Sequence, residues 1–208
     1  MPDALLIGGL FLICFFLGSI PWGVVISRVF YNTDVREHGS GNIGTTNAIR
    51  AMGKVGGYAV FVLDFGKGLA SGFIALAFGQ VNPGLTQLLL GVSFLASVWG
   101  HIFSPWLKFK GGKGIAVAIG NLFVTFGPIG AILELLIFGV LVVATRYVSV
   151  GSIASAAACP FIALYFYWGA WPAWAVISIG ALTVVWAHRA NIARLRDGTE
   201  SRVGDKRK

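Results

Sequence analysis

Long apolar runs alternate with short polar segments along the whole chain. A helix that crosses the hydrocarbon core of a membrane needs roughly 20 mostly apolar residues. Such runs occupy 4–26, 55–79, 85–100, 149–167 and 171–187. The stretch 114–145 is too long for one crossing, and Gly127-Pro128 divides it into two helices, the first of them short. The pattern predicts one all-α domain over 1–208, a polytopic membrane bundle of about seven transmembrane helices. Five spans are the alternative, with 114–145 as one re-entrant or non-spanning unit and the same cytoplasmic loops.

Basic residues gather in alternate loops of this arrangement. Positive side chains accumulate in short loops on the cytoplasmic side of a membrane. The segments 28–54, 108–113, 146 and 189–208 hold every lysine and arginine except Lys67. The connections near Asn82, Gly127 and Gly169 hold none. We therefore expect the N-terminus outside and the C-terminus in the cytoplasm.

The composition is typical of a membrane protein and indicates which classes of ligand it binds. The 208 residues are 56% hydrophobic and 12% charged, with a mean hydropathy of +0.80, more apolar surface than one soluble core can cover. The net charge of +8 lies in the short loops, which favours anionic ligands or lipid headgroups. A nucleic-acid partner is not expected, because there is no soluble basic face. Cys14 and Cys159 lie inside apolar runs with no Cys/His cluster, so we expect no disulfide, metal or cofactor.

The first polar segment, 39–50, combines glycines, small polar side chains and a fixed positive charge. Glycines free the backbone so that its N–H groups can converge on one point. The segment contains Gly39, Ser40, Gly41, Asn42, Gly44, Thr45, Thr46, Asn47 and Arg50. Such a loop can cradle a phosphate. Thr45 stands where a P-loop has its lysine, which argues against a nucleotide triphosphatase.

The second polar segment ends in a glycine-rich turn that opens the next helix. Free N–H groups and the helix dipole make such a turn an anion site. The turn consists of Gly111, Gly112, Lys113 and Gly114, and Lys113 adds a mobile charge. Lys108 is a further candidate for substrate binding. Alternatively, Lys108 and Lys110 are only part of the positive charge that is typical of cytoplasmic loops.

The third polar segment follows the last apolar run. If the chain is helical there, His188, Asn191 and Arg194 recur every third residue and share a face. Lys206, Arg207 and Lys208 fit a positive-inside tail.

The sequence does not decide the role of three charged residues that lie inside apolar runs. Asp64 and Lys67 are three residues apart, which suits either a self-neutralising ion pair or part of a site. Glu134 is isolated, and the sequence assigns it no role.

The polar segments together resemble the bacterial acyl-phosphate:glycerol-3-phosphate acyltransferase family, often called the PlsY family. The similarity lies in GSGNIGTTNAIR at 39–50, DFGKG at 64–68, GH at 100–101 with KFKGGKG at 108–114, and HRANIARL at 188–195 with GTE at 198–200. It covers nearly the whole chain. In the family a proline follows Gly-His-x-Phe directly, whereas here Ser104 intervenes before Pro105, and Arg202 stands where a lysine is common.

The resemblance implies a reaction. The 1-hydroxyl of glycerol 3-phosphate attacks the carbonyl of a fatty acyl phosphate, giving lysophosphatidate and inorganic phosphate in the first acylation of phospholipid synthesis. The substrates are the expected small-molecule partners. Membrane lipids surround the protein, and the enzyme that produces the acyl phosphate is a candidate protein partner. The expected location is the bacterial plasma (inner) membrane, with the site facing the cytoplasm.

We assign roles on this basis as hypotheses. Ser40, Asn42, Thr46, Asn47 and Arg50 hold phosphate, and Arg50 stabilises developing charge. Gly111, Gly112 and Gly114 with Lys113 bind the acyl-phosphate end, and His188 and Asn191 position glycerol phosphate. The catalytic set is Ser40, Arg50, Lys113, His188 and Asn191. The substrate-binding set is Gly39, Gly41, Asn42, Gly44, Thr46, Asn47, His101, Lys108, Gly111, Gly112, Gly114, Arg189 and Glu200.

The general base stays open among His188, His101 and a substrate phosphate. The alternative function is a membrane transporter or flippase for an organic phosphate. Transporters concentrate polar groups near the bilayer midplane, whereas the polar segments here are expected at one interface. A lipid phosphotransferase fits less well, because it needs acidic metal-binding clusters and the eight acids here are scattered.

Overall fold

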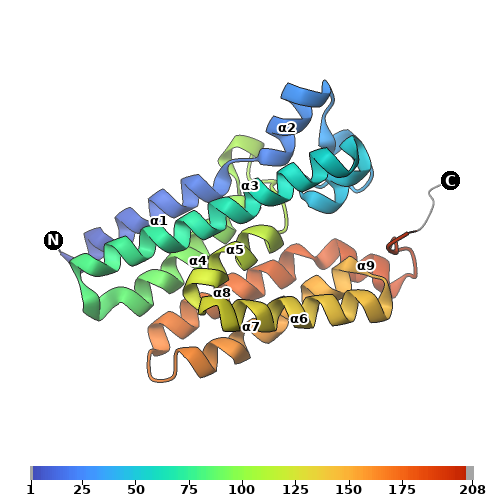
Figure 1. Ribbon diagram of the computed structural model, residues 1–208. Helices are drawn as coiled ribbons and strands as arrows, with labels where there is room; N and C mark the ends of the chain where they lie inside the picture. The colour runs from blue at the N-terminus through green and yellow to red at the C-terminus, as the bar shows by residue number, and fades with distance from the viewer. Residues whose placement is uncertain (1, 205–208) are drawn as a thin grey trace.

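The protein is a bundle of helices (Figure 1). A computed structural model describes residues 2–204, and within that range all regular elements are helical. The α-helices are α1 Asp3–Ser19, α2 Trp22–Tyr31, α3 Thr45–Val81, α4 Thr86–Ile102, α5 Ile115–Thr125, α6 Gly127–Thr145, α7 Val148–Phe166, α8 Trp171–Ala187 and α9 Arg189–Arg196. Three short 3-10 turns are η1 Val35–Glu37, η2 Pro83–Leu85 and η3 Pro105–Leu107. The predicted all-α membrane bundle is confirmed.

Five segments are long and apolar enough to cross a membrane. They are Asp3–Tyr31, Thr45–Val81, Pro83–Leu107, Gly127–Thr145 and Val148–Phe166. The pair α8 and α9, bent by 47°, gives a sixth. The separate short helix predicted before Gly127 is α5, whose 11 residues reach about 16 Å, roughly half of a ~30 Å hydrocarbon core. The expected number of seven spans therefore depends on α5 and stays a prediction.

Two local backbone features divide the helices around the first polar segment, and one of them makes a predicted helix boundary wrong. The helix expected over 4–26 is broken between Ser19 and Trp22, because Pro21 has no N–H to continue the ladder. The helix expected from residue 55 follows a break at Gly53, and a first part of α3, from Thr45 to that break, precedes it. The second half of the first polar segment is therefore helical, which the hydropathy pattern did not predict. Gly53, with φ of 75°, breaks α3 where the two parts meet.

Glycines let α3 and α5 approach closely. A Cβ on Gly68 would collide with the carbonyl of Val117, and one on Gly120 would collide with the carbonyl of Phe65. Small residues at crossing points are how membrane helices bring their backbones together. This contact fixes the start of α5 against the middle of α3.

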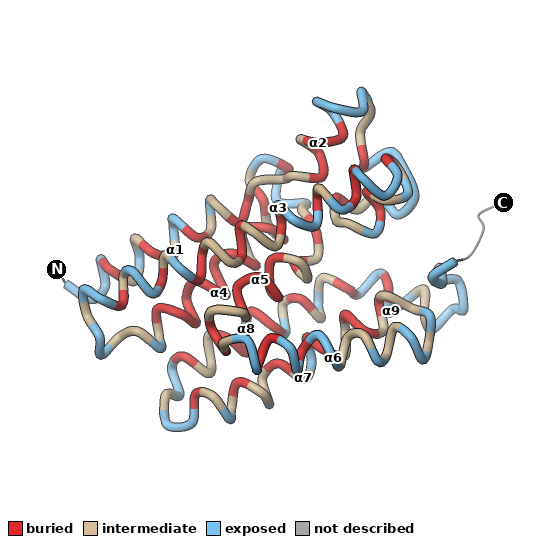
Figure 2. Tube along the Cα trace, viewed as in Figure 1, coloured by how far each residue is buried: buried red, intermediate tan, exposed pale blue. Residues whose placement is uncertain are grey.

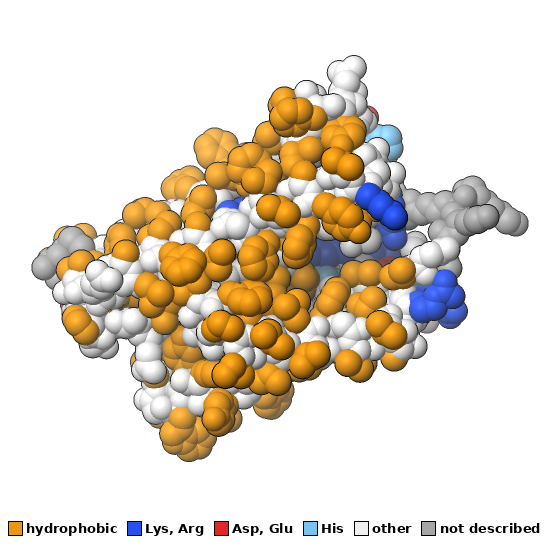
Figure 3. All heavy atoms as spheres, in the orientation of Figure 1, with side chains coloured by type: hydrophobic (Ala, Val, Ile, Leu, Met, Phe, Trp, Pro, Cys, Tyr) orange, Lys and Arg blue, Asp and Glu red, His pale blue; other side chains and the backbone are white. Residues whose placement is uncertain are grey.

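The basic loops lie at one end of the bundle. The buried residues form the interior between the helices (Figure 2), and hydrophobic side chains cover the face shown in Figure 3. In the same view the lysine and arginine side chains gather near the end where the chain finishes. At the other end, the Asn82 side chain donates to Asp3 at 3.0 Å and ties the α3–α4 turn to the N-terminus. The tail residues Lys206, Arg207 and Lys208 lie outside the described residues.

Candidate functional site

Three polar segments that are distant in sequence meet at the basic end of the bundle. Lys113, in the turn before α5, interacts electrostatically with Arg194 and Glu200 beyond α8 and with Arg50 of α3. Figure 3 shows a hollow with basic side chains at this end, between α3 and α6. The structure therefore brings the first, second and third polar segments into one site.

Asn47 organises the first loop. Its Oδ1 accepts a hydrogen bond from the Ser40 backbone N–H at 2.9 Å, and its Nδ2 donates to the carbonyls of Val35 and Asn42, both at 2.8 Å. The side chain is only 2% exposed. Both amide hydrogens are in use, so Asn47 holds the loop in shape and does not itself reach out to a ligand.

The rest of the first loop presents donors outwards. Asn42 Oδ1 accepts from the Gly44 N–H at 2.9 Å, which leaves the amide NH₂ of Asn42 as its outward donor. Gly39 and Gly41 have positive φ angles of 55° and 69°, which glycine adopts without strain. The exposed side chains of this segment include Ser40, Thr46 and Arg50. The first N–H groups of α3, at Thr45 and Thr46, have no preceding helical carbonyl to bond and carry the positive end of the helix dipole.

The second loop is pressed onto the end of α4. Gly111 N–H donates to the carbonyl of Ile102 at 2.9 Å, and Gly112 N–H donates to that of His101 at 3.1 Å. A Cβ on Gly112 would strike the His101 ring, and one on Gly111 would strike the His101 carbonyl. Gly114 caps α5 with φ of 86°. The glycines therefore allow the loop backbone to pack directly against the end of α4. Lys113 lies in the same loop and is close to the charged residues of the site.

A buried polar cluster of Asp64, Lys67 and His101 packs against the 111–114 turn through His101. Lys67 Nζ lies 2.8 Å from Asp64 Oδ1 and 3.0 Å from His101 Nδ1, and it donates to the carbonyl of Ile20 at 2.8 Å. None of the three side chains is more than 4% exposed. The ion pair that was one interpretation of Asp64 and Lys67 is confirmed. Its link to His101, 34 residues on, could not be seen in the spacing of the sequence.

The third segment is built around Glu200. Its carboxylate accepts from Asn191 Nδ2 and from Arg194 Nε, each at 2.7 Å. The expected shared face of Asn191 and Arg194 on a helix is confirmed. Asn191 is 5% exposed, and its Oδ1 has no hydrogen-bond partner among the described residues. That oxygen is a buried acceptor whose hydrogen-bonding capacity is not used by the described residues.

His188 has a defined tautomer. Its Nδ1 lies 2.8 Å from the carbonyl of Val184, and since a carbonyl only accepts, the hydrogen sits on Nδ1. The neutral ring then has its lone pair on Nε2. The side chain is 3% exposed and interacts electrostatically with both Lys113 and Glu200. His188 is thus held beside the cationic cluster in a form able to accept a proton.

Lys113 is largely buried and has both cationic and anionic neighbours. Burial, followed by the positive charge of Arg194, lowers the pKa of Lys113 to about 8; Glu200 partly offsets this, and Arg50 adds to it. A bound phosphate would favour the charged lysine and raise this pKa again.

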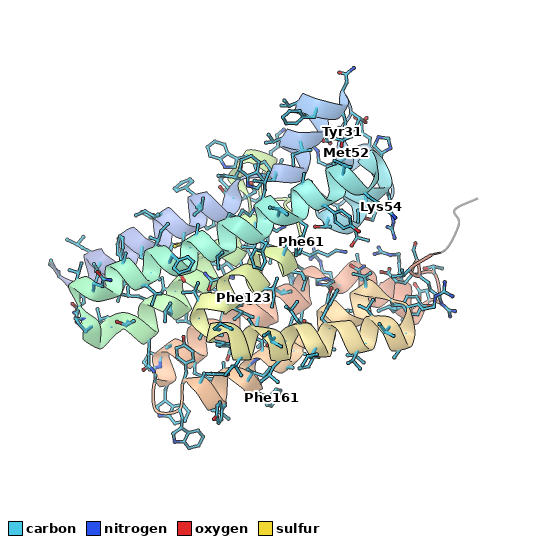
Figure 4. All side chains as sticks on the ribbon, in the orientation of Figure 1. Tyr31, Met52, Lys54, Phe61, Phe123 and Phe161 are labelled. Atoms are coloured by element: carbon cyan, nitrogen blue, oxygen red, sulfur yellow. The ribbon has the colours of Figure 1, made fainter. Side chains whose placement is uncertain are left out.

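An apolar groove extends from the site into the bundle between α3, α5, α6, α7 and α8. Its empty space, including the part that is open to solvent, is about 600 Å³. Ile115, directly after Gly114, and Val184, four residues before His188, line it next to the polar cluster. Phe61 of α3 lies along it, between α3 and the helices drawn below it in Figure 4. A ligand with a polar head and a hydrocarbon tail would fit this combination.

Two expected site residues are not joined to the cluster by the described contacts. Arg189 is exposed and stacks on Trp186, with its guanidinium carbon 3.9 Å from the ring centroid. Lys108 is exposed at the end of η3. Within residues 2–204 no group of three or more His, Cys, Asp or Glu side chains is arranged to hold a metal ion, and both cysteines are free and buried.

The helical membrane architecture, the basic loops gathered at one end and the adjoining apolar groove are those of an integral membrane protein with a site for an amphipathic ligand. Residues 8–198 match the glycerol-3-phosphate acyltransferase family. The chain belongs to this family and is a membrane glycerol-3-phosphate acyltransferase of the PlsY type.

Individual relatives agree along nearly the full length. The glycerol-3-phosphate acyltransferase of Rhodopseudomonas palustris (strain HaA2) is 40% identical over 98% of this chain and 96% of its own. That of Thermus thermophilus is 38% identical, covering 94% of each chain. The crystal structure of PlsY (YgiH), an integral membrane glycerol 3-phosphate acyltransferase in the glycerol 3-phosphate form, superposes with a TM-score of 0.83. It is 34% identical and covers 95% of this chain and 96% of that one.

Proposed function

We propose that this enzyme transfers a fatty acyl group from an acyl phosphate to the 1-hydroxyl of glycerol 3-phosphate. The hydroxyl oxygen forms a bond to the acyl carbonyl carbon, and the bond from that carbon to the phosphate oxygen breaks. The hydroxyl proton leaves to a base. The products are lysophosphatidate and inorganic phosphate, so acyl group, phosphate and proton all balance.

The observation that carries the proposal is the convergence of two loops, each at the N-terminus of a helix and with basic side chains, beside one apolar groove. The first N–H groups of α3 with the 39–47 loop would bind one anion, and Lys113 with the first N–H groups of α5 would bind the other, since Gly111 and Gly112 donate to carbonyls of α4. Lys113 and Arg50 interact across the space between them. Both proposed substrates carry a phosphate and one carries a long chain, which matches two anion sites and one groove.

The acyl phosphate belongs at the 111–114 turn in this proposal. Gly111, Gly112 and Gly114 bring the backbone close, and Lys113 neutralises the phosphate that leaves. The turn is continuous with Ile115, which lines the groove, so a chain attached to that phosphate enters the groove directly. A mixed anhydride has a good leaving group, and direct attack by the acceptor then needs no protein nucleophile.

Glycerol 3-phosphate belongs between the first loop and α9. Ser40, Asn42, Thr46 and Arg50 are outward-facing donors for its phosphate, and Arg50 also stabilises charge developing on the carbonyl. Asn191 Oδ1 is a ready acceptor for one of its hydroxyls. Glu200 fixes the position of Asn191 and of Arg194 and acts through them.

The proton has two favoured destinations. His188 offers Nε2 once Nδ1–H is bonded to Val184, and a substrate phosphate offers its own oxygen. His101 is less suitable, because it is buried under Gly112 with Nδ1 on Lys67. We assign His101 to holding the 111–114 turn. The site faces the cytoplasm of a bacterial inner membrane in this proposal, supported by the concentration of basic loops at that end.

The donor is tested with purified protein in lipid, given glycerol 3-phosphate and a choice of palmitoyl phosphate or palmitoyl-CoA. Lysophosphatidate is quantified. We expect product from the acyl phosphate and none from the thioester. Product from palmitoyl-CoA alone would keep the acyltransferase activity and overturn the donor assignment.

The base is tested with His188→Ala and His188→Gln. If His188 accepts the proton, both variants lose kcat by at least about a hundredfold while the KM for acyl phosphate stays near that of the wild type. Near-normal turnover in either variant would assign the proton to a substrate phosphate.

A further inference from the structure

A second apolar groove lies between α4 and α8, and we call it the outer groove. Its lining residues are Trp99, Phe103, Ile179, Leu182, Thr183 and Trp186. The α8 residues that line the groove beside the polar site are instead Ala181 and Val184, and both are buried. Ile179, Leu182 and Trp186 are each about half exposed. The outer groove therefore lies on another face of α8 and is open to the surroundings of the bundle.

The polar groups of Trp99 and Thr183 inside the outer groove are bonded within the protein. Trp99 Nε1 donates to Thr183 Oγ1 at 3.1 Å, and the Thr183 hydroxyl donates to the carbonyl of Ile179 at 2.7 Å. The rings of Phe103 and Trp186, one from each helix, pack with their centroids 5.8 Å apart. This stretch therefore offers a ligand mainly apolar contact, which suits a hydrocarbon chain.

The outer groove reaches the basic end of the bundle. Trp186 is the last residue but one of α8, and Phe103 directly follows α4. Ile179 lies seven residues before Trp186, so the groove extends about 10 Å along α8. An extended hydrocarbon chain advances about 1.3 Å per carbon, given C–C bonds of about 1.5 Å, so roughly eight carbons fit along it. That length corresponds to the first half of one phospholipid chain, measured from the headgroup.

Arg189 lies at the basic end of the outer groove. Its guanidinium carbon is 3.9 Å from the centroid of the Trp186 ring, and its Nη1 donates to the Trp186 carbonyl at 3.4 Å. The side chain is exposed and takes part in none of the ion pairs within residues 2–204. A guanidinium has five N–H donors, so most of them remain for an anion outside the protein.

The acidic side chains of the third segment lie away from Arg189. Glu200 is bonded to Asn191 and Arg194, and residues two apart on a helix, such as Arg189 and Asn191, do not share a face. Asp197 caps the far end of α9, about 12 Å along the helix from Arg189. An amine in a zwitterionic headgroup would therefore find no carboxylate of this segment beside Arg189. A headgroup that carries a net negative charge matches the guanidinium better.

We propose that the outer groove binds an anionic phospholipid from the leaflet at the basic end of the bundle. The guanidinium of Arg189 binds the headgroup phosphate, and one acyl chain lies along the groove from Trp186 to Ile179. Basic side chains where helices leave the membrane attract anionic lipids, and aromatic rings are common at the same level. The bound lipid covers the outside of the junction between α8 and α9, next to His188. Binding does not depend on which acyl donor the enzyme uses, because the two grooves lie on different faces of α8.

The test measures lipid binding to the purified full-length protein in detergent by native mass spectrometry. Phosphatidylglycerol and phosphatidylcholine with the same two acyl chains are titrated separately, and the Kd of the first bound lipid is determined. We expect the wild type to bind phosphatidylglycerol about tenfold more tightly. In phosphatidylcholine the quaternary amine offsets the phosphate charge, whereas in phosphatidylglycerol the full charge contacts Arg189.

Two variants probe the two ends of the outer groove. Arg189→Gln should raise the Kd for phosphatidylglycerol about tenfold and remove the preference over phosphatidylcholine. Leu182→Trp places a larger side chain in the groove and keeps Arg189, so it should weaken binding of both lipids severalfold. Arg196→Gln is the matched control, since it removes the same charge from an exposed position on α9, about 10 Å beyond Arg189. The control should keep the wild-type preference.

Three results would overturn the lipid site. They are equal wild-type Kd values for the two lipids, an equal loss of phosphatidylglycerol binding in Arg189→Gln and Arg196→Gln, and wild-type binding of both lipids in Leu182→Trp. A dimer that Leu182→Trp dissociates, in place of a lipid-bound monomer, would assign the outer groove to a second copy of the chain. If Arg189→Gln does not fold, Leu182→Trp and the wild-type comparison of the two lipids still decide.

Discussion

Replacing Lys67 by methionine tests the buried support of the site. Methionine fits the length of the lysine stem but removes the ammonium group. That group lies 2.8 Å from Asp64 and 3.0 Å from His101, and donates to the Ile20 carbonyl at 2.8 Å. The substitution would leave Asp64, which is 1% exposed, without its counter-charge inside the bundle.

The expected cost is large. Removing one partner of a buried ion pair destabilises a protein by about 3–5 kcal/mol, because the other charge stays buried and uncompensated. Replacing both partners by apolar groups is often neutral or stabilising. The double variant Asp64→Leu with Lys67→Met should therefore unfold at higher denaturant than the single variant, by several kcal/mol in the free energy of unfolding. Both should lose activity, since His101 and the Gly112 turn lose their anchor.

The assay is chemical unfolding in lipid–detergent micelles, read by tryptophan fluorescence, alongside acyl transfer. Lys110→Met, an exposed loop substitution, is the matched control and should stay within about 0.5 kcal/mol of the wild type. The reasoning is refuted if Lys67→Met unfolds like the wild type, or if the double variant is no more stable than the single one.

Three further substitutions, in the 111–114 turn and at Glu200, have expected effects on activity. Lys113 is charged below its pKa of about 8, so kcat/KM should fall as pH rises past that value, and Lys113→Arg should extend the activity to higher pH in a pH–rate profile. Gly112→Ala should lower kcat about a hundredfold by displacing the turn, whereas Gly139→Ala, with nothing within 4 Å, should keep wild-type rates. Glu200→Gln should raise the KM for glycerol 3-phosphate about tenfold or more, since two charge-assisted hydrogen bonds weaken; an unchanged KM would contradict its positioning role.

Much of the fold follows from hydropathy alone. The apolar run 171–187 coincides with α8, and Gly127-Pro128 marks the break between α5 and α6 as expected. The breaks at Pro21 and Gly53 have a common cause. A hydropathy pattern registers where a chain is apolar, whereas these two residues act on backbone geometry.

The sequence predicts which loops form the site, but it does not predict what each residue in those loops contacts. Motif chemistry indicated Lys113, His188 and Asn191, which the structure places at one end of the bundle. It could not indicate that Asn47 uses its hydrogen bonds within its own loop, or that His101 lies beneath Gly112. Both depend on tertiary contacts between segments that are far apart in the sequence.

The most direct test of the account is the coupling of phosphate release to acyl transfer. Purified enzyme is mixed with acyl phosphate in the presence and absence of glycerol 3-phosphate, and inorganic phosphate and lysophosphatidate are measured in the same sample. Direct attack by the acceptor predicts one phosphate per lysophosphatidate and no release, not even a first turnover, without glycerol 3-phosphate. A stoichiometric burst of phosphate in the absence of the acceptor would reveal an acyl-enzyme intermediate and contradict the account.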